Sequence, residues 1–172
     1  MRTELLALEQ TAAWYREKMA WQVEIDQARV VLPLGRGIVA FTVPPERVNH
    51  VRKRLERLEN NNFCTPALLR DSESKMGRHA VFLAEPDHNV LGQYQMPIGT
   101  RYLSAPSVLP LPTRKAAEAT DGTWLCAPDP HRRWLFAAST VLSIINAVTP
   151  LQMRSHDTNP RRNPTGSRLL IG

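Results

Sequence analysis

The chain has 172 residues, of which 42% are apolar, and this length suits one globular domain with a single sizeable core. A formal net charge of +6 favours polyanionic partners such as nucleic acid. Two cysteines cannot build a disulfide framework, and no apolar run approaches the roughly 18 residues of a membrane span.

Cys64 and Cys126 form no CxxC or CxxxC pair, so a zinc site is not expected, and the prediction is two free thiols in a reducing cytoplasm. The N-terminal stretch MRTELLALEQ is interrupted early by acids and lacks the apolar centre of a signal peptide. We therefore expect a cytoplasmic protein without a membrane partner, and no motif predicts a cofactor.

The first element is a helix over residues 3–20, for which Thr3 can serve as the N-cap. Residues 21–45 predict three consecutive strands in a meander, because β-branched runs follow one another and are separated by glycines. Arg36 stands in the turn between the second and third strands, flanked by Gly35 and Gly37. An arginine there can contact phosphate, although GRG is also a common turn sequence.

The acids Glu24 and Asp26 are two residues apart on the first strand, so their side chains share one face. Such a pair can bind Mg²⁺ through hard oxygen ligands. The alternative is an amphipathic strand whose acidic face meets water, since Val23 and Ile25 alternate with the acids.

A second helix follows Pro45, which suits a first helical turn. Its apolar stripe is expected at Val48, Val51, Leu55 and Leu58. Its other face is basic and includes Arg52 and Lys53. These two cations are candidate nucleic-acid contacts, with a mixed solvated face as the alternative.

The rest of the folded part is predicted as short strands and one last helix. The strands are expected at residues 67–70, 78–84, 90–95, 100–104 and 124–128, and the helix at 134–148. The fold class is therefore α+β: a single domain over residues 1–148, with a mostly antiparallel sheet and flanking helices. Residues 149–172 are basic, rich in Pro, Arg and Asn, and predicted to be a disordered tail.

The stretch SKMGRHAVFLAE places an ionisable ring at the mouth of an apolar strand. His79, with Arg78 before it and Arg101 on a later strand, is a candidate phosphate-binding group. The alternative is an ordinary, partly exposed histidine at the end of a strand.

The order of elements resembles the bifunctional primase–polymerase (Prim-Pol) domain of the archaeo-eukaryotic primase fold. The resemblance covers residues 11–128 and rests on order and spacing, because each motif is short. It is carried by TAAWYREKMAWQV with Trp21, by the histidine strand SKMGRHAVFLAE, by IGTRYLSAPSVLPLP and by GTWLCAP. It implies that His79 helps to position nucleotide phosphates and that nearby acids hold two divalent ions.

Those acids are missing from this chain. The strand that the resemblance assigns to the acid pair reads GIVAFTVPPE, with Ala40, Phe41, Thr42 and Val43 at the acid positions, and the third acid would fall near Gly99 and Thr100. Hydroxyl and apolar side chains cannot replace carboxylates for hard cations. The sequence therefore predicts no catalytic and no metal-binding residues.

The resulting expectation is a non-catalytic Prim-Pol-like domain that binds nucleic acid, a nucleotide or a protein partner. A regulatory protein-interaction module without nucleic-acid binding is the alternative, and an exposed apolar patch at Trp134, Leu135 and Phe136 would favour it. A metal-dependent nucleotidyltransferase or hydrolase is the remaining reading. It would require Glu24 with Asp26, or His79 with His88, to converge.

Overall fold

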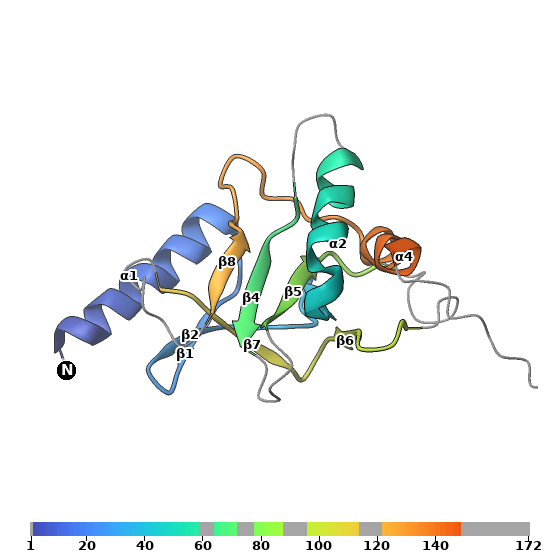
Figure 1. Ribbon diagram of the computed structural model, residues 1–172. Coiled ribbons are helices and arrows are strands. Elements are labelled where there is room, and N and C mark those ends of the chain that lie inside the picture. The colour runs from blue at the N-terminus through green and yellow to red at the C-terminus, as the bar shows by residue number, and fades with distance from the viewer. Residues whose placement is uncertain (1, 59–63, 72–77, 88–95, 114–121, 149–172) are drawn as a thin grey trace, which may run out of the picture.

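The computed structural model describes residues 2–58, 64–71, 78–87, 96–113 and 122–148. Within these ranges the chain forms helices on two sides of two antiparallel sheets, so the expected α+β single domain is confirmed (Figure 1). The tail 149–172 and the strand expected at 90–95 lie outside the described residues. Among the described helices, none combines the length and the apolar character needed to cross a membrane.

Three helices cover the sheets within the described residues: α1 (Arg2–Met19), α2 (Pro45–Leu58) and α4 (Ala138–Val148). Helix α1 packs on the smaller sheet, whereas α2 and α4 pack on each other and on the larger one (Figure 1). The apolar stripe of α2 is buried at Val48, Val51 and Leu55. Leu58 is 53% exposed, so its predicted place in the stripe is wrong.

The smaller sheet has the order β1-β2-β7 and the larger one the order β6-β3-β5-β4-β8. The strands are β1 (Glu24–Asp26), β2 (Arg29–Pro33), β3 (Val39–Val43), β4 (Ala67–Asp71), β5 (Arg78–Ala84), β6 (Arg101–Leu103), β7 (Val108–Leu111) and β8 (Thr123–Cys126). All pairs within these sheets are antiparallel.

The larger sheet lies between two apolar clusters, so its inner strands are buried on both faces. On one face Phe41 lies opposite Phe82, and both side chains pack under α2 and α4. On the other face Leu68, Val81 and Leu83 pack toward α1 and the smaller sheet. Residues two apart on a strand point to the same face of the sheet. Alternation along each strand therefore tells which of the two apolar clusters a side chain faces.

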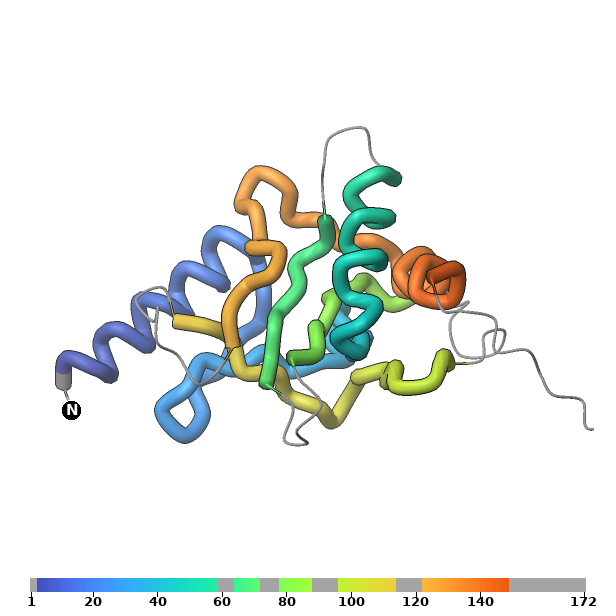
Figure 2. Tube along the Cα trace, in the orientation of Figure 1, coloured from blue at the N-terminus to red at the C-terminus, as the bar shows by residue number. Residues whose placement is uncertain are grey.

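The predicted three-stranded meander is wrong in its last step. Strands β1 and β2 form a hairpin, but the other neighbour of β2 is β7, and β3 belongs to the larger sheet. The chain changes sheets at the glycine turn, where Gly35 N–H donates to Ile38 O at 2.7 Å. Figure 2 follows the chain from the blue β1–β2 hairpin to the yellow segment of its later partner β7.

Strand β7 was not predicted, because its proline-rich sequence VLPLP argues against a strand. Pro110 stands within it, opposite Val31 of β2. Proline removes a backbone donor and is tolerated at the edge of a sheet, which is the place that β7 occupies.

The last helix begins at Ala138, four residues later than predicted. Residues 134–137 are not helical, and Ala137 forms an isolated parallel bridge with Glu85. The cap also comes from far away in the sequence, since the Asp87 carboxylate accepts hydrogen bonds from the backbone N–H and the hydroxyl of Ser139. Apolar periodicity alone could not reveal this start.

Candidate functional site

Three basic side chains lie on one face at one end of the larger sheet. Arg70 of β4 is paired directly with His79 of β5, and Arg101 lies two strands away on β6. Each alternates with a residue of the cluster that faces α1: Leu68, Val81 and Leu103 respectively. We call Arg70, His79 and Arg101 the cationic row.

Burial and two nearby arginines lower the pKa of His79. The ring is half-buried, and burial is the largest cause that lowers its pKa. The charges of Arg70 and Arg101 lower the pKa further, whereas Asp71 raises it. The loss of solvent and the two guanidinium groups thus outweigh the nearby carboxylate, and both favour the neutral ring.

Thr42 occupies the point in the row where the resemblance implies an acid. It lies on β3 opposite Arg101, and its hydroxyl accepts a hydrogen bond of 2.9 Å from the Arg101 backbone N–H. Thr42 also shares its face with the cationic row, because it alternates with Ala40. A neutral hydroxyl therefore stands beside Arg101, and Thr42 is paired on its other side with Val81, two residues along β5 from His79.

Arg78 does not join the cationic row. It alternates with Ala80, whose side chain packs toward α2 and α4, so Arg78 lies on the opposite face from His79. Its Nε lies 2.8 Å from Asp71 Oδ1, in an exposed ion pair. The structure separates these two neighbours in sequence.

Arg52 and Lys53 lie on α2, which packs on the other face of the larger sheet. Arg52 is half-buried, and its Nε lies 3.5 Å from Glu56 Oε1. Lys53 is exposed beside Arg54 and Arg57. These cations form a separate basic surface, and the thickness of the sheet divides it from the cationic row.

Arg36 lies at the opposite end of β3 from Thr42 and Arg101, in the exposed turn before that strand. It lines a hollow of about 370 Å³ together with Glu85, Arg133 and Trp134. Trp134 is 44% exposed, and its ring meets Phe136 edge to face. We call this site the tryptophan hollow.

The apolar patch expected around Trp134 is not formed. Leu135 and Phe136 are buried at 9% and 8% exposure, so Trp134 is the exposed member of the three. This arrangement gives one exposed indole in a hollow that Arg36 and Arg133 also line, rather than a broad apolar surface.

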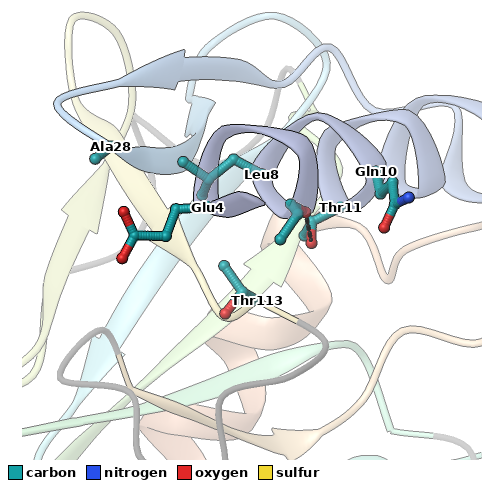
Figure 3. A pocket seen from close by; sticks show the side chains of 7 residues that line it. Glu4, Leu8, Gln10, Thr11, Ala28 and Thr113 are labelled. Atoms are coloured by element: carbon teal, nitrogen blue, oxygen red, sulfur yellow. Dashed lines mark hydrogen bonds between the residues drawn. The ribbon is translucent and has the colours of Figure 1, made fainter. Parts of the chain in front are cut away.

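A larger hollow of about 640 Å³ lies between α1 and the turn of the β1–β2 hairpin (Figure 3). Its lining side chains come from Glu4, Ala7, Leu8, Gln10, Thr11, Ala28 and Thr113. Glu4 is the charged residue among them, and the Thr11 hydroxyl already donates to Ala7 O at 2.9 Å. Among the described residues that line it, this hollow offers no cation for an anionic ligand.

Glu24 and Asp26 are both exposed on β1, an edge strand of the smaller sheet. Within the described ranges, no group of three or more His, Cys, Asp or Glu side chains comes together in a way that could hold a metal ion. His88 lies outside these ranges, so the suggested pairing of His79 with His88 has no described geometry.

Sequence reasoning selected His79 and Arg101, which the structure brings together, but it missed Arg70. Arg70 could have been found, because it lies two residues after the buried Leu68 and therefore on the same face of its strand. That strand pairs with the strand that carries His79. It also missed Arg133, which the fold brings to the same hollow as Arg36 and which has no local signature in the sequence.

Comparison of the chain with protein-family models, curated proteins and solved structures finds no match in any of the three.

Proposed function

We propose that this chain is a non-catalytic, Prim-Pol-like domain that binds single-stranded nucleic acid, in the cytoplasm, through the cationic row. The observation that carries the proposal is the placement of Arg70, His79 and Arg101 on one face, where the two guanidinium charges add to burial in lowering the pKa of His79. Phosphate groups neutralise such charge and form strong hydrogen bonds to guanidinium.

The arrangement of the strands supports the Prim-Pol part of the proposal. The segments in which the resemblance implies the acid pair and the histidine contain β3 and β5, and the segment of the third acid leads into β6, so the three segments belong to neighbouring strands of the larger sheet. Thr42, one of the four residues at the expected acid positions, shares a face with His79 and Arg101. A face that keeps phosphate-binding cations without carboxylates is suited to binding rather than to metal-assisted nucleotidyl transfer.

A titration with a fluorescent single-stranded oligonucleotide at several salt concentrations tests this function. Arg70→Ala and Arg101→Ala should each weaken binding and lower the slope of log K against log salt by about 0.7, the value for one phosphate contact on a single strand. Arg78→Ala is the matched control, because Arg78 lies on the opposite face and is paired with Asp71. It should leave both affinity and slope nearly unchanged.

Two outcomes would refute the proposal. Lack of binding at low salt would favour the protein-interaction module instead. An effect of Lys53→Ala without any effect of Arg101→Ala would move the interface to the exposed face of α2.

A second candidate function is the binding of a mononucleotide in the tryptophan hollow. Arg36 and Arg133 can contact phosphate, while the exposed Trp134 ring can stack on a base. Trp134→Ala should abolish binding of a fluorescent nucleotide and leave the salt slope for the oligonucleotide unchanged. Equal nucleotide affinity in the variant would remove this candidate.

A further inference from the structure

Two cysteines from distant parts of the chain meet beneath α2. Cys64 lies three residues before β4 and is buried, whereas Cys126 ends β8 and is half-buried. The register of β4 and β8 places Ala67 opposite Cys126, and both cysteine side chains pack in the cluster under α2 and α4. The interaction between the two side chains is the largest influence on the pKa of each thiol, in keeping with their place next to each other in this cluster.

The surroundings give the two thiols different characters. The hydrogen bond from Cys64 is the largest cause that lowers the pKa of Cys126, and burial opposes it. The same hydrogen bond, followed by burial, strongly raises the pKa of Cys64. Arg52 lowers and Glu56 raises the pKa of both cysteines by smaller amounts. Cys126 is thus the more exposed sulfur and the one that can carry negative charge.

We propose that Cys64 and Cys126 are a redox-active dithiol, which hydrogen peroxide converts into an intramolecular disulfide. The Cys126 thiolate attacks one peroxide oxygen, the O–O bond breaks and hydroxide leaves, so that Cys126 becomes a sulfenic acid. The Cys64 sulfur then attacks the Cys126 sulfur. An S–S bond forms, the S–O bond breaks, and the departing hydroxide takes the Cys64 proton as water.

The electrons balance in this sequence. Each sulfur loses one electron overall, and the peroxide takes up both electrons and is reduced to two waters, one of which uses the proton that Cys126 released on ionising. The proximity of the two thiols favours the disulfide over further oxidation, because the second thiol reaches the sulfenic acid without a large movement of the backbone.

The new bond would join the segment before β4 to the end of β8, which is an edge strand of the larger sheet. It would close a loop that contains β4, β5, β6 and β7. A cross-link over so long a loop restricts the unfolded chain, so the oxidised protein should unfold at a higher temperature than the reduced protein. This readout is independent of nucleic-acid binding.

Intact-mass spectrometry of the full chain, titrated with hydrogen peroxide at pH 7, tests the proposal. The expected result is the loss of two hydrogens per chain, with one cross-linked peptide that joins Cys64 to Cys126. Cys64→Ser keeps the nucleophile and a hydrogen-bond donor beside it, and should accumulate a sulfenic acid that dimedone traps. Cys126→Ser should react with peroxide more slowly by on the order of tenfold or more, because the remaining thiol is buried and protonated.

Three results would overturn the proposal: an unchanged mass with both thiols still free, cross-links that form only between chains, or equal peroxide rates for the two variants. The first two are measured on the unaltered protein and do not depend on the folding of a variant. Circular dichroism checks that both variants fold.

Discussion

His79 shows how one residue can be identified from sequence while its role depends on its neighbours. The sequence placed a histidine at the mouth of an apolar strand, and the structure adds Arg70 opposite it and Arg101 nearby. Alternation along β5 was enough to put His79 on the face of Val81. The pairing that supplies the two arginines depends on the order of strands in the sheet, which a single strand does not reveal.

The pKa of His79 predicts a pH dependence of stability. Because the folded protein lowers this pKa below its ordinary value of about 6.5, the unfolded chain takes up a proton more readily. The contribution of His79 to stability is therefore complete above pH 6.5 and is lost as the pH falls through the folded-state pKa. His79→Gln should lose less stability between pH 7.5 and pH 5 than the wild type, as measured by urea unfolding.

Equal losses in the two proteins would contradict a lowered pKa of His79 in the folded protein. His50→Gln is the matched control for the substitution itself, because His50 is exposed on α2 and lies outside the cationic row.

At the scale of elements, Tyr15 connects α1 to segments far along the chain. Its hydroxyl donates to Pro112 O at 3.1 Å and accepts from Trp124 Nε1 at 3.2 Å, while its ring stacks on Trp21 with centroids 5.7 Å apart. The helix was predictable from its apolar periodicity, but these partners were not, since they lie about a hundred residues later.

Tyr15→Phe should destabilise the fold by about 1–3 kcal/mol, because it leaves the Trp124 N–H and the Pro112 carbonyl without their partner. Chemical denaturation measures the loss. Tyr102→Phe is the control: Tyr102 is half-buried, and among the described residues its hydroxyl forms no hydrogen bond. Equal effects of the two variants would contradict the importance assigned to the Tyr15 hydroxyl.

The β1–β2 hairpin turns through Gln27 and Ala28, which both have positive φ angles, of 45° and 60°. A two-residue turn of this kind prefers Asn-Gly, because other residues are strained in the left-handed region. The double substitution Gln27→Asn with Ala28→Gly should raise the free energy of unfolding by about 1 kcal/mol.

Ala13→Gly, inside α1, is the control for the hairpin variant and should instead lower stability by about 1 kcal/mol. A loss of stability in the hairpin variant would argue against this turn.

The elements themselves were largely predictable, and their assembly was not. The first two helices and most strands followed from periodicity and from glycine and proline punctuation. The sheet change after β2, the edge strand β7 and the late start of α4 depended on pairing across the chain, such as the cap that Asp87 provides for Ser139. Local sequence patterns do not predict partners that lie so far away in the chain.

Across the whole molecule, positive charge is concentrated away from α1 and the first hairpin. The described residues of 2–35 contain four Arg and Lys against five Asp and Glu, whereas those of 36–148 contain eleven against six. The larger sheet and the helices on it therefore carry the excess that would attract a polyanion. Two basic surfaces share this excess, the cationic row and the exposed face of α2.

An NMR titration of the histidine rings against pH, with and without a saturating single-stranded oligonucleotide, decides between these surfaces. A phosphate beside Arg70 and Arg101 favours the protonated imidazole, so we predict that the pKa of His79 rises in the complex while the ring signals of His50 on α2 stay in place. An unchanged pKa of His79 in the presence of the oligonucleotide, or changes in the ring signals confined to His50, would contradict nucleic-acid binding at the cationic row.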